Sequence, residues 1–152
     1  MRISDNILIQ NAEIYRRLRN TLFKFCLANI SDFDFDKNAC NDFSEIDCLV
    51  LTKLAANIDH INLCYEQYDL MTIIRIINSH VIELSGWYFD IIKDALYCEQ
   101  QNSLRRRTIQ TVLFHVLHSY LILLTPIIPH TCEEVYSFIK ISHKGPSIIL
   151  EK

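Results

Sequence analysis

The stretch LMTIIRIINSHVIELSGWYFDIIKDALY, residues 70–97, decides the fold. Its apolar side chains recur at three- and four-residue spacings along the whole stretch, which predicts one long amphipathic helix. The apolar face is wide, so we expect this helix to be central. The only glycine in it, Gly86, costs about 1 kcal/mol against alanine inside a helix, and so predicts either a kink or a close backbone approach.

Two helices are expected before this stretch. Ser4 offers an N-cap, and apolar spacing predicts a first helix over residues 4–29. The run from Ser44 to Asp47 resembles a capping box and predicts the start of a second helix. The positions predicted to be buried on the second helix are Ile46, Leu49, Val50, Leu54, Ile58, Ile61 and Tyr65.

Two more helices are expected after it. Ser103 is a candidate N-cap for a helix that runs to about residue 125, where two prolines end it. Thr131 and Glu134 have the spacing of another capping box, which predicts a short helix through residue 139. The segment 29–47, between the first and second helices, is rich in aspartate and is predicted to be a solvated loop.

The composition fits a single domain of this kind. The chain has 152 residues, enough to bury a core; half of them are hydrophobic and only two are glycine. We therefore predict an all-α fold, an antiparallel bundle of about five helices in one domain covering residues 1–152. A short extended tail is expected from about residue 141.

The cysteines and the hydropathy pattern bear on compartment and membrane. Six scattered cysteines without a CxxC pair argue against a cysteine-rich zinc site and favour free thiols in a reducing cytoplasm. The longest apolar stretch, residues 112–128, is interrupted by histidines and prolines, so it predicts a buried helix and not a membrane span.

Charge is distributed unevenly along the chain, whose net charge is −3. Lys and Arg exceed Asp and Glu in residues 1–30 and 103–152, whereas acidic residues dominate 31–70. A negative chain is a poor general nucleic-acid binder, so any such contact should be local to the first and last segments.

Three consecutive arginines, Arg105, Arg106 and Arg107, fall in the first turn of a predicted helix. Cations there lose about 0.3–1 kcal/mol each against the helix dipole, so their presence calls for a reason. Guanidinium groups beside the free N–H groups of a helix start would make a phosphate receptor. The alternative, equally open from the charge pattern, is that the arginines pair with the acidic connector.

No residue pattern predicts catalysis or a metal site. The chain lacks G-x-S-x-G, Walker and H-E-x-x-H motifs, and we predict no catalytic residue. His115 and His118 lie three apart without a nearby carboxylate or thiol, which favours packing over metal binding. His130 and Cys132 hold metal-capable atoms, but the predicted capping box accounts for the acid beside them.

Several blocks make a family resemblance visible. The sequence resembles the helical anticodon-binding domain of isoleucyl-tRNA synthetase, a class I aminoacyl-tRNA synthetase. The resemblance covers nearly the whole chain. The similar blocks, in order, are RISDNIL, AEIYRRLRNTLFKFCLANISDFD with its Arg-Asn-Thr run, ELSGWYFDIIKDALYC, RRRTIQTVLFHVL and LLTPIIPHTCEEVY.

The resemblance implies that this chain is a piece of a larger enzyme. In that family a separate catalytic domain, with His-x-Gly-His and Lys-Met-Ser-Lys-Ser signatures, activates isoleucine and transfers it to tRNA. Neither signature occurs here, so the piece alone is expected to catalyse nothing and to need no cofactor. The parent enzyme would use ATP with magnesium, and many members of that family also carry a zinc module at the C-terminus.

The resemblance also implies a role in holding tRNA, with the isoleucine acceptor tRNA and the catalytic domain of the same polypeptide as partners. Arg19 and Asn20, in the Arg-Asn-Thr run, are predicted to hold the bundle against the catalytic domain. The candidates for phosphate contacts are Arg16, Arg17, Arg105, Arg106 and Arg107, with Lys93 a weaker one.

Two alternatives stay open at this point. The chain could be the equivalent domain of a valyl- or leucyl-tRNA synthetase, although the run YFDIIKDALY is the isoleucyl version of that block. It could also be a helical protein-interaction scaffold whose arginines only pair with the acidic region 31–70.

Overall fold

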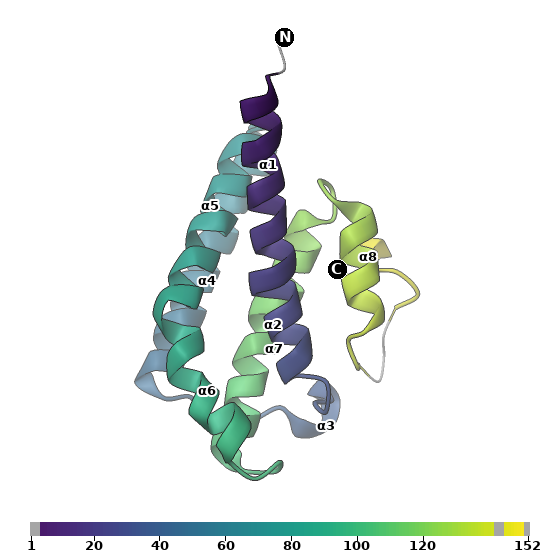
Figure 1. Ribbon diagram of the computed structural model, residues 1–152. Helices are drawn as coiled ribbons and strands as arrows, with labels where there is room; N and C mark the ends of the chain where they lie inside the picture. Colours follow the sequence, from purple (N-terminus) through teal and green to yellow (C-terminus); the bar gives the residue numbers. More distant parts are fainter. Residues whose placement is uncertain (1–3, 142–144, 151–152) are drawn as a thin grey trace.

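The computed structural model describes residues 4–141 and 145–150, and within these ranges the chain is helical without a β-strand. The helices form a bundle in which neighbours run largely antiparallel, which confirms the predicted all-α class (Figure 1). The principal α-helices are α1 (Asp5–Arg17), α2 (Lys24–Asn29), α3 (Phe35–Asn38), α4 (Glu45–Glu66), α5 (Leu70–Glu83), α6 (Phe89–Cys98), α7 (Leu104–Leu124) and α8 (Pro129–Ser137).

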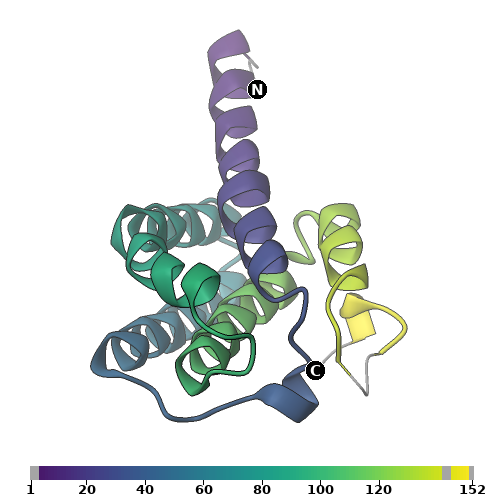
Figure 2. The same cartoon turned by 60° about the horizontal axis from the view of Figure 1, so that its bottom comes forward.

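The first helix is continuous from α1 to α2 because a π-helical segment, η1 (Leu18–Phe23), joins them. This confirms the helix predicted over residues 4–29. No residue of α1 is buried, and the helix projects away from the others at its N-terminal end (Figure 2). The side chains enter the core from Leu18 onward, so the second half of this helix anchors the first.

The long helix predicted over residues 70–97 is also present, as α5 and α6 joined by a second π-helical segment, η2 (Leu84–Tyr88). Gly86 lies inside η2, where the helix bends (Figure 1). A Cβ built on Gly86 would have no heavy atom within 4 Å, so of the two predicted explanations the kink is confirmed and close backbone approach is wrong.

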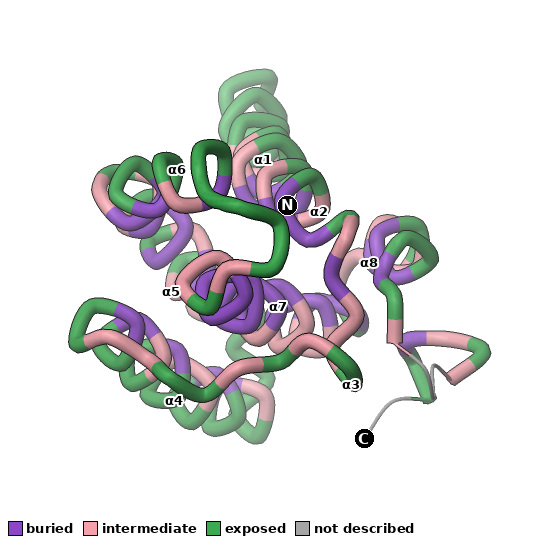
Figure 3. The backbone as a smooth tube through the Cα atoms, turned by 90° about the horizontal axis from the view of Figure 1, so that it is seen from below, coloured by how far each residue is buried: buried purple, intermediate pink, exposed green. Residues whose placement is uncertain are grey.

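The central helix is α7, which corrects the expectation that residues 70–97 would be. Every residue from 107 to 114 is buried, and α7 is surrounded by α2, α4, α6 and α8 (Figure 3). A wide apolar face marked the 70–97 helix, but α7 buries polar residues too, among them Thr108, Gln110 and Thr111. Counting apolar positions therefore underestimated its burial.

Local capping signals were reliable at α4 and α7 but not at α8. Ser44 and Asp47 form the predicted capping box, and the Ser103 side chain accepts a hydrogen bond from the Arg106 backbone. In contrast α8 starts at Pro129 without a side-chain cap, so the predicted box of Thr131 and Glu134 is wrong. Two positions expected to be buried on α4, Ile46 and Leu49, are exposed.

The connector between α2 and α4 is ordered against the core, so the predicted solvated loop is wrong for much of it. Phe33 is buried, and Phe35, in the one-turn helix α3, stacks on Phe114 of α7 with ring centroids 4.3 Å apart. Apolar residues placed between the aspartates thus pull the segment onto the bundle.

The chain end differs from the predicted extended tail where it is described. Ile148–Leu150 form a 3₁₀ turn, η3, and Ile148 is buried against the core. The parts of the predicted tail at residues 142–144 and 151–152 lie outside the described residues. Among the described residues no helix is both long and apolar enough to cross a membrane.

Two leucines test the position of the core. Leu117 of α7 is 0% exposed and Leu63 of α4 is 55% exposed. Leu117→Ala should lower the free energy of unfolding by about 2–5 kcal/mol, because it leaves a cavity, whereas Leu63→Ala should change it by less than about 1 kcal/mol. Urea unfolding followed by circular dichroism measures both; similar losses in the two variants would contradict the central place of α7.

Candidate functional site

The three arginines at the start of α7 are held by carboxylates of the connector and of α4. Asp32 receives two hydrogen bonds from Arg106, Nη1 to Oδ2 at 2.7 Å and Nη2 to Oδ1 at 3.1 Å. Gln110 Nε2 donates to the same carboxylate at 2.8 Å. The Arg106 hydrogen bonds, helped by Gln110, hold the pKa of Asp32 well below its usual range despite partial burial.

Arg107 is more enclosed than its neighbours, with 7% of its surface exposed. Its Nη1 donates to Gln110 Oε1 at 2.9 Å and to the Asp32 backbone oxygen at 3.2 Å, and its Nη2 donates to Asn102 at 2.8 Å. Most N–H groups of the Arg107 guanidinium are therefore hydrogen-bonded within the chain and are not available to a ligand.

Arg105 pairs with Asp47 at the start of α4, where the carboxylate is fully buried. The Tyr88 hydroxyl donates to the other oxygen of Asp47 at 2.9 Å, and Ser44 completes the group. Burial alone would raise the pKa of Asp47, but the hydrogen bonds from Arg105 and Ser44 lower it overall. The same burial raises the pKa of Tyr88.

The sequence allowed two roles for the three arginines, a phosphate receptor or pairing with the acidic region. The contacts above are that pairing. A phosphate could reach Arg106 or Arg107 only if they left Asp32, because their side chains are largely enclosed. Arg105 keeps a third of its side chain exposed and is the most accessible of the three. Phosphate contact by this triplet stays a prediction, and the geometry favours a structural role for Arg106 and Arg107.

The other cations predicted to contact phosphate lie on the surface. Arg16 pairs with Glu13 at 2.6 Å and Arg17 donates to Asn78 of α5 at 2.9 Å. Both line a shallow depression that also includes Asn20. Lys93 is on α6, paired with Asp90, which raises the pKa of the lysine. The structure thus groups Arg16 with Arg17, and leaves Lys93 on another helix.

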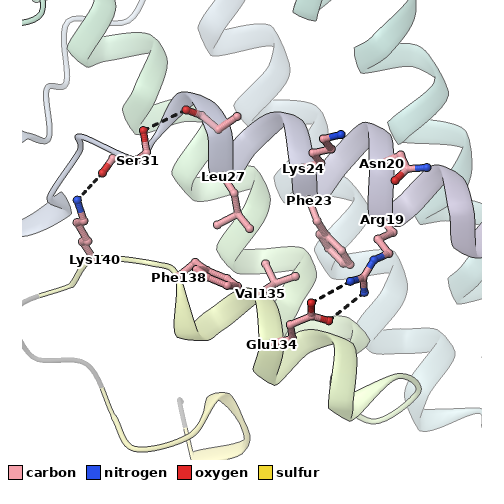
Figure 4. Close-up of a pocket in the computed structure, with 11 residues that line it drawn as sticks. Arg19, Asn20, Phe23, Lys24, Leu27, Ser31, Glu134, Val135, Phe138 and Lys140 are labelled. Atoms are coloured by element: carbon pink, nitrogen blue, oxygen red, sulfur yellow. Dashed lines mark hydrogen bonds and ion pairs between the residues drawn. The ribbon is translucent and has the colours of Figure 1, made fainter.

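A groove of about 610 Å³ lies between the first helix and α8 (Figure 4). Phe23 and Leu27 from the first helix and Val135 and Phe138 from the α8 side give it an apolar lining. Phe138 is 66% exposed, so its ring is accessible on the α8 side of the groove.

Polar bridges close the two ends of this groove (Figure 4). Arg19 donates to both oxygens of Glu134, at 2.8 and 2.9 Å, and this contact raises the pKa of Arg19 and lowers that of Glu134. Lys140 donates to the Ser31 backbone oxygen at the other end. Arg19 and Asn20, the predicted domain-interface residues, both line the groove.

Two histidines of α7 and the thiol of Cys132 are engaged in packing. His115 packs edge-on to Phe35, and burial lowers the pKa of its ring. His118 stacks on Phe114. Burial raises the pKa of Cys132 to about 11, so this thiol is protonated at neutral pH. In the part of the chain that the structure describes, no three His, Cys, Asp or Glu side chains gather where they could hold a metal ion.

Sequence reasoning missed Asp32 and the exposed Phe138. Asp32 stood in a run of aspartates that looked solvated, although the buried Phe33 beside it was a signal that the run is anchored. Phe138 follows α8 in a helical apolar pattern, and nothing in its spacing distinguishes an exposed ring from a buried one.

Comparison with known proteins gives a consistent picture. A family model described as "Anticodon-binding domain of tRNA ligase" matches residues 47–152. The chain is 48% identical over 149 residues to an isoleucine–tRNA ligase of Malacoplasma penetrans, a match that covers 98% of the chain and 17% of that ligase. It is 44% identical over 142 residues to an isoleucine–tRNA ligase of Bacillus cereus, covering 91% of the chain and 15% of the ligase. The chain thus spans about a sixth of the length of the relatives it matches.

The Asp32 cluster predicts a pH dependence of stability. The pKa of Asp32 is depressed in the folded chain and near 3.9 when unfolded, so its stabilising contribution is present at pH 7 and shrinks as the pH falls below about 4. Asp32→Asn should cost about 2 kcal/mol at pH 7 and progressively less toward acid pH.

Urea unfolding at several pH values measures this difference, and Asp42→Asn serves as the control because Asp42 is exposed in the same connector. The control should change the free energy of unfolding by less than about 0.5 kcal/mol at every pH. A gap between the parent chain and Asp32→Asn that stays constant down to acid pH would contradict the assigned role.

Proposed function

The chain belongs to the family of anticodon-binding domains of tRNA ligases, and we propose that it holds the anticodon stem and loop of a tRNA for a catalytic domain elsewhere in the same polypeptide. The family match over residues 47–152 is the observation that carries this proposal. Aminoacylation itself would be performed by that catalytic domain.

The amino acid specificity of the parent enzyme is proposed to be isoleucine. Relatives named isoleucine–tRNA ligase, at 39–48% identity over nearly the whole chain, support isoleucine over valine or leucine. The tRNA would then be the isoleucine acceptor, and the parent enzyme would work in the cytoplasm with ATP and magnesium. Zinc would be held by a C-terminal module of the parent enzyme.

The cations proposed to contact RNA phosphates are those that the fold leaves accessible. Arg16 and Arg17 are adjacent on α1 and share one depression, and Arg105 and Lys93 add accessible charge elsewhere. Arg106 and Arg107 would act mainly by fixing the connector, because a phosphate would have to displace Asp32. Phosphate contacts of this kind give affinity and salt sensitivity without reading sequence.

The rest of the polypeptide is proposed to dock on the first helix and its groove. Ile7, Leu8 and Ile9 are exposed on α1, which buries no residue of its own. Apolar surface of this extent is typical of an interface between domains. Arg19 and Asn20 line the adjoining groove, consistent with their predicted place at the domain interface.

A helical scaffold remains the second candidate, and one observation favours it: the pairing of the arginine triplet with Asp32 and Asp47. That pairing removes Arg106 and Arg107 as independent support for RNA binding. The proposal therefore depends on the family match.

RNA binding can be measured directly with an anticodon stem-loop of isoleucine tRNA by fluorescence anisotropy. Affinity should fall steeply between about 50 and 200 mM salt, because phosphate contacts release counterions. The double variant Arg16→Ala, Arg17→Ala should weaken binding and reduce the salt slope by about 1 for each lost contact.

The matched control is Lys37→Ala, which removes another exposed cation that pairs with an acid three positions away, as Arg16 does. Its binding curve should coincide with that of the parent chain. Equal losses in the control and the double variant would reject Arg16 and Arg17 as specific contacts, and absence of RNA binding at low salt would favour the scaffold.

A further inference from the structure

A second concavity lies between α4 and α5 and is lined mainly by hydrogen-bonding side chains. Its volume is about 350 Å³. Since residues four apart share one helix face, the spacing of the lining residues on each helix brings their polar groups together. The polar lining residues are Lys53 and Asn57 of α4 and Arg75, Ser79, His80 and Glu83 of α5.

A buried chain of hydrogen bonds holds the His80 ring at the base of this pocket. Asn57 Nδ2 donates to the Tyr120 hydroxyl at 3.2 Å, and that hydroxyl is also hydrogen-bonded to His80 Nδ1. The hydroxyl still has one proton to donate, and we assign that proton to the bond with Nδ1 as part of the proposal below. The neutral ring then carries its own proton on Nε2, on the side away from Tyr120.

His80 is neutral at physiological pH and its Nε2 is unused by the protein. The residue is only 3% exposed, and this burial lowers the pKa of His80 to about 4. The described residues supply no hydrogen-bond partner for Nε2, although the ring lines the pocket. With the assigned tautomer, Nε2 carries an N–H whose orientation is fixed by the bond between Nδ1 and Tyr120.

The remaining groups of the pocket are also predominantly donors. Arg75 and Ser79 form no hydrogen bond or ion pair with another described residue, so their N–H groups and hydroxyl remain available to a ligand. The Asp69 carboxylate, at the N-cap of α5, attracts the Arg75 guanidinium electrostatically without a hydrogen bond to it. Lys53 bridges to Glu83, which occupies the one carboxylate in the lining. Uncommitted donors thus exceed acceptors, which suits a ligand that carries several acceptor oxygens.

We propose that this pocket binds a phosphate group, held by the Arg75 guanidinium, the Ser79 hydroxyl and His80 Nε2–H. The guanidinium can donate two parallel hydrogen bonds to two phosphate oxygens. The His80 Nε2–H and the Ser79 hydroxyl, also on α5, would donate to the remaining phosphate oxygens. The phosphate belongs either to an RNA backbone or to a free phosphate compound. This site is separate from the contacts proposed for Arg16 and Arg17 and does not depend on them.

The probe is inorganic phosphate, titrated into the 152-residue chain at constant ionic strength with chloride as the balancing anion. The readout is the ¹⁵N chemical shift of His80 Nε2 in NMR spectra. A saturable shift is expected, weakened at least tenfold in Arg75→Gln, severalfold in Ser79→Ala and only partly in Arg75→Lys, which keeps the charge but loses the fork. Lys37→Gln, a change of an exposed cation in the connector, should leave the titration unaltered.

A linear, non-saturating shift, or one that Arg75→Gln leaves unchanged, would overturn the proposal. An anticodon stem-loop RNA separates the two sources of phosphate. If RNA displaces inorganic phosphate and binds more weakly to Arg75→Gln, the ligand is backbone phosphate; if RNA leaves the phosphate titration intact, the ligand is a free phosphate compound. Failure of RNA binding as such would leave the phosphate titration, and hence this test, unaffected.

Discussion

The contact on which the arrangement of this bundle depends is the one between Asp32 and the start of α7. The carboxylate follows directly on the end of the first helix and accepts hydrogen bonds from Arg106, Arg107 and Gln110. It thereby fixes where the first helix stops, how the connector crosses the bundle and where α7 begins. Enclosed charges are tolerated in the folded chain because each is paired with an opposite charge. Removal of one partner destabilises the fold, since the remaining charge is left buried and unpaired.

Local features of the sequence predicted the fold well. The long helices follow from apolar spacing, and the caps at Ser44 and Ser103 could be read because each involves residues only three apart. The kink at Gly86 could also be predicted, because a glycine inside a helical pattern is a local signal. The central place of α7 was not, since its burial of Thr108, Gln110 and Thr111 depends on partners elsewhere in the chain.

The candidate sites were predicted less completely because they are made by distant pairs. Arg19 was singled out from a motif, but its partner Glu134 lies 115 positions away and was assigned to a cap. The arginine triplet was recognised, but the sequence did not decide whether its guanidinium groups would bind phosphate or pair with aspartates. The pocket between α4 and α5 had no sequence signal, because Tyr120, which orients His80, comes from a third helix.

The π-helical segment η1 has a consequence for how the two halves of the first helix face their surroundings. Each i→i+5 hydrogen bond encloses one residue more than an α-helical bond does, so the Arg-Asn-Thr run sits where the helix changes phase. Removal of a single residue there would restore a regular helix and leave α1 facing nearly as it does now, because the wider turn already holds the extra residue. Removal of a residue from a regular α-helical turn would instead rotate α1 by about 100° relative to α2. The segment is thus the place in the first helix where the chain can lose one residue while the exposed apolar residues of α1 keep their direction and the core stays packed.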